Sequence, residues 1–319
     1  MAETNNGENI KACDTGKRKP IIQERTVFEH WRETLRICDN IRTRGNLEFP
    51  TGIGFLDEVT GGLHRGEIWL VSGRPGSGKT SLALQMAGSF SDDTSHRVLF
   101  SSLEMRGWEL LLRMFCEMFG VEYTLFLKGQ VTFNPQQKQI FEEYLKAIQF
   151  EVVEHGFIFE ELEHTLKSRY IDEMPDVIFL DFIQLIDWQA LGDERLAIVA
   201  YMRKIKEMAK KYNVAFVVVS QLRRAPSGAD CNRPPELSDL MGSGSLEQAA
   251  DKVIFLYKII EESAGNEDIR HILSLAKHRQ GPLVKKQILF EGKYYRFSDP
   301  ADHSIVKETV KEFGGSVSD

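Results

Sequence analysis

The sequence predicts an α/β fold in which a mostly parallel β-sheet is covered by helices on both faces and followed by a C-terminal β-hairpin. Short apolar runs, such as those at 68–71, 177–180 and 215–219, recur along the chain between segments with helical periodicity. Strands that are apolar at nearly every position are typical of parallel sheets, because both sides of such sheets are buried. A glycine-rich loop between the first of these strands and the next helix is the second observation that predicts this fold.

The composition is ordinary for a soluble globular protein. The chain has 319 residues, of which 42% are hydrophobic and 27% are charged, and its formal net charge is −7. Any basic surface for nucleic acid therefore has to be local. The four cysteines include no Cys-x-x-Cys pair, which favours a reducing compartment over a disulfide framework or a zinc site. No apolar run approaches the roughly 18 residues of a membrane span and no signal core is visible, so we expect a cytoplasmic protein.

The first 48 residues are predicted to lie outside the sheet domain. Residues 1–26 are polar and mixed in charge, which is typical of a disordered tail. Over 27–48, apolar residues recur at spacings of three and four and predict an amphipathic helix; they are Phe28, Trp31, Leu35, Cys38 and Ile41. This stripe suits packing on its own domain and docking on a neighbouring subunit equally well. We expect the core domain to span 49–300 and a second tail to span 301–319.

The elements of the core are expected in a regular order. A short helix over 53–63 ends at two glycines, which suit a helix C-terminus. The apolar runs predict strands at 67–72, 97–102, 150–153, 176–181, 215–221, 252–257 and 271–275. Helical periodicity follows the glycine-rich loop from residue 81 and recurs over 107–144, 159–170 and 194–212. The hairpin at 285–297, with its turn at 291–293, comes last.

The glycine-rich loop matches the phosphate-binding pattern G-x-x-x-x-G-K-[ST]. Its residues are Gly73, Arg74, Pro75, Gly76, Ser77, Gly78, Lys79 and Thr80, with Ser81 next in the helix. The glycines allow successive backbone N–H groups to point at phosphate oxygens, and the helix N-terminus adds partial positive charge. Lys79 can reach the β- and γ-phosphates, and the Thr80 hydroxyl can ligate Mg²⁺. The strand before the loop and the helix after it favour a nucleotide site over a chance glycine-rich turn.

Three polar residues follow or end apolar strands, at the edge of the sheet where ligands of such folds bind. Asp181 can hold Mg²⁺ opposite Thr80, although an acid at a strand end is often only a turn residue. Glu104 can orient and deprotonate an attacking water, or be a surface glutamate that starts a helix. Gln221 can sense a γ-phosphate, or be a buried amide bonded to the backbone.

Lys277 and Arg279 occupy alternate positions of an extended segment, so we expect their side chains to point the same way. They could reach the phosphates of a nucleotide held by the next subunit, with Arg279 as an arginine finger worth about 10³ or more in rate. On these residues alone, an ordinary exposed basic turn is the preferred interpretation.

From Thr51 to Asp299 the chain resembles the C-terminal ATPase domain of DnaB-type replicative helicases, within the RecA-like group. A P-loop alone is shared by many families, whereas the ordered series of matching segments is specific. The series is 60–63, 74–75 with 78–80, 100–105, 113–114, 181–186, 220–222, 237–251 and 277–282, of which 237–251 is the most distinctive.

The resemblance implies a RecA-like core that forms a ring, hydrolyses ATP at subunit interfaces and translocates on single-stranded DNA in replication. It implies that Lys79, Thr80 and Asp181 bind ATP and Mg²⁺. Glu104 is then the general base, Gln221 the γ-phosphate sensor, and Lys277 and Arg279 act on the neighbour's nucleotide. DNA contacts are implied for the channel loop at Gly242, Ser243, Gly244 and Ser245. The implied partners are single-stranded DNA, further copies of the chain in a hexameric ring, and a primase or loader protein, with no membrane.

Some features depart from the family pattern. The family's N-terminal domain is expected to be replaced by the short tail. The channel loop has Met241 and Gly242 where the family usually has an arginine and a glutamate, and the other candidate loop, at 187–195, is acidic. These departures leave an alternative, a RecA/KaiC-like regulatory or remodelling ATPase that acts through protein partners without unwinding. A nucleotide-gated scaffold without activity is the third possibility, against which the catalytic set of Lys79, Glu104, Asp181 and Arg279 argues.

Overall fold

The computed structural model describes residues 26–29, 31–32, 34–35, 48–154, 159–170, 174–185, 192–223, 233–241, 243–263 and 266–300. The chain divides into two compact units, Met1–Thr43 and Arg44–Asp319. The domain boundaries remain a prediction. Of the predicted tail at 1–26, the structure describes only Thr26, and the tail at 301–319 and residues 36–47 lie outside the described residues.

In the first unit, the described residues between 27 and 35 are helical. Thr26 and Glu29 form a reciprocal cap at the start of this helix: the Thr26 N–H donates to the Glu29 carboxylate at 2.6 Å, and the Glu29 N–H donates to the Thr26 hydroxyl at 3.3 Å. Among its described residues, this helix exposes the apolar side chains Val27, Phe28, Trp31 and Leu35.

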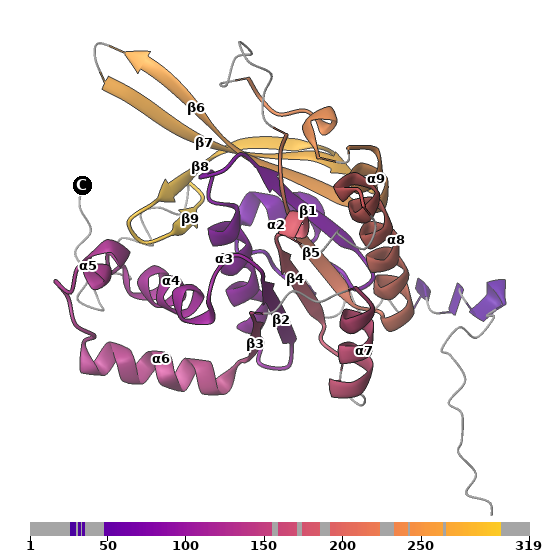
Figure 1. Cartoon of the computed structure of the whole chain (residues 1–319), viewed down its shortest axis with the longest axis horizontal. Helices are drawn as coiled ribbons and strands as arrows, with labels where there is room; N and C mark the ends of the chain where they lie inside the picture. Colours follow the sequence, from indigo (N-terminus) through magenta and orange to yellow (C-terminus); the bar gives the residue numbers. More distant parts are fainter. Residues whose placement is uncertain are drawn as a thin grey trace, which may run out of the picture. The chain divides into compact units, whose positions relative to one another are not determined.

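Within the described residues, the second unit is built on a nine-stranded sheet with the order β3-β2-β4-β5-β1-β6-β7-β8-β9 (Figure 1). The strands are β1 Ile68–Gly73, β2 Arg97–Ser102, β3 Gln149–Val153, β4 Val177–Asp181, β5 Ala215–Gln221, β6 Lys252–Ser263, β7 Asn266–His278, β8 Val284–Glu291 and β9 Arg296–Ser298. The pairs from β3 across to β6 are parallel, and those from β6 to β9 are antiparallel. The predicted mostly parallel sheet with a C-terminal hairpin is therefore confirmed.

Helices cover both faces of this sheet. They are α2 Gly54–Thr60, α3 Lys79–Ser91, α4 Gly107–Phe119, α5 Tyr123–Leu127, α6 Pro135–Ala147, α7 Phe159–Arg169, α8 Glu194–Tyr212 and α9 Ser243–Ala249, with 3-10 turns η1 Ile183–Leu185 and η3 Leu237–Asp239. Alternate side chains of a strand point to opposite faces. In β5, Val217 and Val219 therefore join the core with α3 and α4, whereas Phe216 and Val218 join the core with α8. Burial on both faces explains why the strands are apolar throughout.

The last strands are longer than the sequence indicates. We expected strands at 252–257 and 271–275, but β6 and β7 form a long antiparallel hairpin in which Ile260 pairs with Ile269. Figure 1 shows this hairpin, in orange, extending beyond the rest of the sheet. Both isoleucines are exposed, so main-chain pairing rather than burial defines this part, and no apolar run marks it in the sequence. The turn of the last hairpin lies at 292–295, because β8 continues to Glu291, which pairs with Arg296.

Among the helices that the structure describes, none combines the length and hydropathy that a transmembrane span requires.

Candidate nucleotide site

The phosphate-binding loop joins the carboxyl end of β1 to α3, as predicted. Gly76 and Gly78 have φ angles of 72° and 95°, which residues with a Cβ rarely adopt. Gly73 has a different reason to be glycine, because a Cβ there would lie 2.3 Å from the carbonyl oxygen of Leu256 in β6. The glycines thus serve both the curl of the loop and its close contact with the sheet.

Lys79 is the first residue of α3, and its side chain is buried. Its Nζ donates a 3.0 Å hydrogen bond to the Arg74 carbonyl across the loop. Burial lowers the pKa of Lys79, and the nearby carboxylates of Asp181 and Glu104 oppose this shift. The structure thus brings together three of the side chains that the sequence assigned to one site.

Asp181 ends β4 and is 0% exposed. Burial raises the pKa of Asp181 to about 6, although the Thr80 hydroxyl and the Lys79 ammonium lower it. Neither carboxylate oxygen accepts a hydrogen bond of ordinary geometry from the described residues. A buried carboxylate without such partners is unfavourable unless a cation compensates it. Asp181 with Thr80 therefore fits a Mg²⁺ ion, a hard cation that prefers oxygen ligands and shares them with nucleotide phosphates.

Glu104 follows β2 and is exposed to solvent. The N–H of the preceding residue, Leu103, donates to the Asp181 carbonyl at 2.8 Å and so fixes this turn beside β4. Glu104 is close enough to influence the pKa of both Lys79 and Asp181. An exposed carboxylate beside the phosphate-binding loop is accessible to water, as a general base must be.

Gln221 lies beside the phosphate-binding loop, because it pairs with Gly73 in neighbouring parallel strands. A residue that the sequence analysis did not assign, Gln184, holds its main chain. Gln184 Oε1 accepts from the Gln221 N–H at 3.2 Å, and its Nε2 donates to the Gln221 carbonyl at 3.3 Å and the Ser220 hydroxyl at 2.8 Å. The available signal was its place in the family-like segment 181–186.

Arg113 is a second residue that the sequence analysis left without a role. Its guanidinium lies 4.2 Å from the ring centre of Tyr295 and 5.9 Å from that of Tyr123. Its charge also lowers the pKa of Asp181. Arg113 therefore connects α4 to the turn of the C-terminal hairpin beside the candidate metal residue.

Lys277 and Arg279 do not join this group. They lie at the amino end of β1, since Lys252 pairs with Trp69 in β1 on one side and with His278 in β7 on the other. With about 3.3 Å per residue, β1 separates this edge from the phosphate-binding loop by about 16 Å. Within one chain, the predicted catalytic residues therefore form two groups at opposite edges of the sheet.

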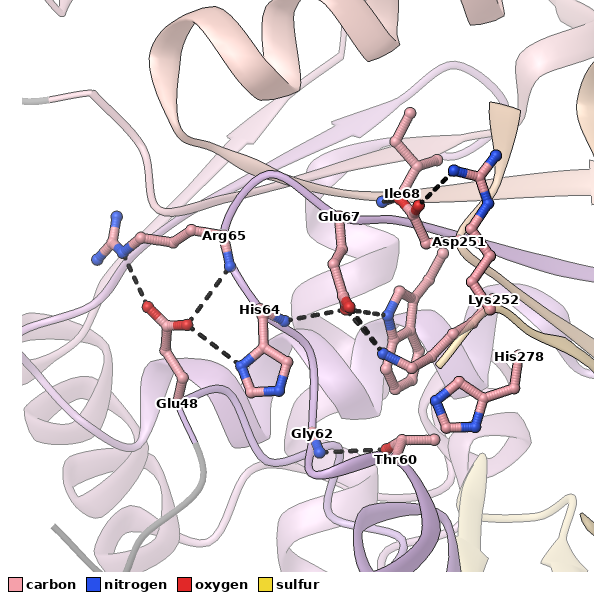
Figure 2. Close-up of polar contacts among 12 residues, drawn as sticks. Glu48, Thr60, Gly62, His64, Arg65, Glu67, Ile68, Asp251, Lys252 and His278 are labelled. Atoms are coloured by element: carbon pink, nitrogen blue, oxygen red, sulfur yellow. Dashed lines mark hydrogen bonds and ion pairs between the residues drawn. The ribbon is translucent and has the colours of Figure 1, made fainter. Parts of the chain in front are cut away.

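A buried ion pair stabilises the amino edge of β1 (Figure 2). Lys252 Nζ lies 3.0 and 2.8 Å from the two carboxylate oxygens of Glu67, and the Trp69 indole N–H donates to the same carboxylate at 2.9 Å. The ammonium also lies 4.8 Å from the centre of the indole ring. These contacts satisfy the pair, so Lys252 is a structural residue of this edge.

The predicted DNA-contact residues are only partly in a loop. The sequence placed residues 242–245 in a channel loop, but Ser243, Gly244 and Ser245 form the first turn of α9, and Gly242 falls outside the described part of the chain. Leu246 is fully buried, which anchors the helix. The other candidate loop, at 187–195, is described only from residue 192. Within it, the Asp193 carboxylate caps α8 by accepting hydrogen bonds from the N–H groups of Arg195 and Leu196.

The fold and the site define a P-loop protein of the RecA-like class. The family described as DnaB-like helicase C-terminal domain matches residues 48–299, and the chain belongs to this family. It is 31% identical over 265 residues to the replicative DNA helicase DnaB of Leifsonia xyli subsp. xyli (strain CTCB07), a match that covers 79% of this chain and 56% of that protein. The chain thus spans little more than half the length of this curated relative.

Two solved structures share the fold. One is a DnaB-like replicative helicase described with its interactions with primase, with a TM-score of 0.71 and 26% identity over 84% of this chain and 66% of that one. The other is described as an ATPase domain, and it has a TM-score of 0.71 and 25% identity over 84% of this chain and 97% of that one.

Proposed function

We propose that this protein is an ATP-dependent DNA helicase of the DnaB type that forms a ring and translocates on single-stranded DNA during replication. The observation that carries the proposal is the separation of Lys277 and Arg279 from the phosphate-binding loop. A head-to-tail ring places one edge of each subunit against the opposite edge of the next. In such a ring, the two groups from neighbouring subunits form one complete site.

Each group has a defined task in this site. Lys79 and the loop N–H groups bind the phosphates of ATP, and Thr80 and Asp181 hold Mg²⁺, which neutralises charge on the β- and γ-phosphates when bound. Glu104 accepts a proton from the attacking water. Gln221, held by Gln184, senses the γ-phosphate. Lys277 and Arg279 of the next subunit stabilise the negative charge of the transition state.

The remaining assignments extend the proposal to partners. Ser243, Gly244 and Ser245 in α9, with Gly242, contact the DNA backbone. In the helix predicted at 27–48, the exposed side chains Phe28, Trp31 and Leu35 dock on an adjacent subunit, because exposed apolar patches mark interaction sites. A hexameric ring, a primase or loader partner and a cytoplasmic location complete the proposal. The solved DnaB-like helicase that is described with its interactions with primase supports the primase partner.

A regulatory ATPase that acts through protein partners is the second candidate, favoured by Met241 and Gly242 in place of the charged residues usual in the family. ATP hydrolysis with and without single-stranded DNA separates the two, on protein whose mass is measured in the same Mg²⁺-nucleotide buffer. Strong stimulation on a hexamer-sized particle supports the helicase. Hydrolysis that no single strand stimulates favours the regulatory ATPase.

A further inference from the structure

Asp251 lies between α9 and β6. At the amino edge of the sheet, it connects β1, α8 and the segment that follows β7. Its Oδ2 accepts the Ile68 N–H at 2.9 Å and lies 2.5 Å from Lys206 Nζ, and its Oδ1 lies 3.3 Å from Arg279 Nη1. The main chain of Asp251 adds two hydrogen bonds. The Asp251 N–H donates to the Ile68 carbonyl at 2.8 Å, and the Arg279 N–H donates to the Asp251 carbonyl at 3.1 Å. Figure 2 shows Asp251 beside Ile68 at this edge.

The end of α9 supplies further acceptors for the two cations. Arg279 Nη2 donates to the Gln248 carbonyl, and Lys277 Nζ donates to the carbonyls of Glu247 and, at 2.9 Å, Ala250. The last carbonyls of a helix lack partners within the helix, so cations are favourable there. Both cations are therefore held by the end of α9, and Asp251 adds the carboxylate that orients Arg279.

Without these contacts, an arginine on an exposed segment would sample many rotamers. The entropic cost of ordering its side chain in the transition state would then reduce the rate enhancement that it provides. The Arg279 side chain is 44% exposed, whereas that of Asp251 is 15% exposed. The guanidinium has five N–H donors, and the contacts with Asp251 and Gln248 leave others for a phosphate. The cations Lys206, Lys277 and Arg279 outnumber the nearby carboxylates of Asp251 and Glu247, so this edge keeps an excess of positive charge.

We propose that Asp251 is a positioning residue for Arg279, which it orients toward the nucleotide of the neighbouring subunit. This inference rests on the proposed function, because it requires Arg279 to act across a subunit interface. Asp251 itself contacts no nucleotide: its own subunit's phosphate-binding loop lies at the far end of β1.

The first test is Asp251→Asn in the full chain. An asparagine oxygen can still accept the Ile68 N–H, but the charge that orients Arg279 is lost. We expect kcat for ATP to fall about tenfold or more, since small misplacements cost about 10²-fold, while KM changes less than about twofold. Glu207→Gln is the matched control, because this exposed carboxylate pairs with Arg203 in the same helix, and it should leave both constants unchanged. An unchanged kcat in Asp251→Asn would overturn the inference.

The second test uses mixed rings made by co-expression. Lys79→Ala removes the phosphate-binding lysine but leaves Arg279 and Asp251 intact. In a ring that mixes it with Asp251→Asn, some interfaces combine an intact loop with a correctly held Arg279. We expect turnover above that of either variant alone, which a purely structural role of Asp251 would not produce.

The pair Arg279→Ala with Lys79→Ala is the reference. If this pair recovers turnover and the Asp251→Asn pair does not, the positioning role is wrong while the proposed function stands. If the reference pair also fails, the action of Arg279 across the interface is wrong, and the inference falls with it.

Discussion

The side-chain amide of Gln85 makes two hydrogen bonds with the main chain of Phe297. Its Nε2 donates to the Phe297 carbonyl at 2.8 Å, and its Oε1 accepts the Phe297 N–H at 2.8 Å. Gln85 belongs to α3, which begins at Lys79, and Phe297 lies in β9. The Phe297 ring also packs under the loop, since a Cβ at Gly78 would lie 2.8 Å from it. The C-terminal hairpin therefore supports the helix that carries Lys79.

We expect Gln85→Ala to lower the free energy of unfolding by about 1–3 kcal/mol, because two partly buried main-chain groups lose their partners. Urea denaturation measures this change. Gln139→Ala is the matched control, because the exposed Gln139 amide donates to the exposed Glu143 carboxylate on α6, and its effect should stay within about 0.5 kcal/mol. Equal effects of the two variants would show that the link between α3 and β9 contributes no stability.

Asp181→Asn is expected to stabilise the ligand-free protein while removing its activity. The variant replaces a buried charge that lacks hydrogen bonds with a neutral amide, so the midpoint of thermal unfolding should rise. The same change removes the carboxylate proposed to hold Mg²⁺, so ATP turnover should fall by about 10² or more. Calorimetry and a phosphate-release assay give the two readouts. A lower unfolding midpoint would contradict our interpretation that the cost of burying the Asp181 charge exceeds what Lys79, Thr80 and Arg113 offset.

The burial of His271 predicts that the region of the C-terminal strands loses stability as the pH falls. The His271 ring packs edge-on against Phe290, with 5.1 Å between ring centres, and its buried Nε2 has no hydrogen-bond partner among the described residues. Burial lowers the pKa of His271 to about 4, and Lys258 on the paired strand adds to the shift. The unfolded chain therefore binds a proton near pH 6.5 that the folded chain does not bind until about pH 4.

The stability associated with neutral His271 is thus complete above about pH 6.5 and is lost as the pH falls toward 4. The loss is on the order of 2 kcal/mol for a half-buried ring. His271→Leu should flatten this part of a curve of unfolding free energy against pH. His64→Leu is the control, because His64 lies beside the Glu48 carboxylate rather than in an apolar cluster. If unfolding free energy falls with pH equally steeply in His271→Leu and in the unaltered protein, His271 is not the source of the acid sensitivity.

Lys277→Ala is expected to loosen α9, because Lys277 donates to two carbonyls at the end of this helix. A helix of seven residues is marginal without such contacts. Loss of about 1 kcal/mol corresponds to roughly fivefold faster amide exchange in the last turn of α9. Hydrogen exchange followed by mass spectrometry, without nucleotide or DNA, measures this directly.

Arg203→Ala is the matched control for α9, because this exposed cation on the neighbouring α8 pairs with Glu207. Its exchange pattern in α9 should equal that of the unaltered protein. If Lys277→Ala gives the same pattern as Arg203→Ala, Lys277 does not cap the helix.

Much of the fold could be predicted because its signals are local. The apolar run at 215–219 reflects burial of β5 on both faces, and Gly78 reflects a φ angle that its neighbours in the loop impose. The phosphate-binding loop, Asp181 and Gln221 were found for the same reason: each is marked by the end of an apolar strand. The long β6–β7 hairpin was underestimated because its outer part is held by main-chain pairing, which leaves no apolar pattern.

Residues whose roles depend on distant partners carried no such signal. Gln184 holds the main chain of Gln221 across 37 positions, and Arg113 meets Tyr295 from a different part of the chain. Such pairs depend on which elements lie side by side, and the pattern along one segment contains no information about that.

The sequence by itself determined that this protein has a parallel α/β sheet, a phosphate-binding loop at the end of its first strand and a series of segments like those of DnaB-type helicases. The tertiary structure alone decided where Lys277 and Arg279 lie. Since β6 pairs with β1 in parallel and β7 returns beside β6, the cations end at the edge opposite the loop. Strand order follows from packing of the whole sheet rather than from any local periodicity. Only the folded chain therefore shows that the residues predicted to be catalytic are divided between two edges, with Asp251 beside the second group.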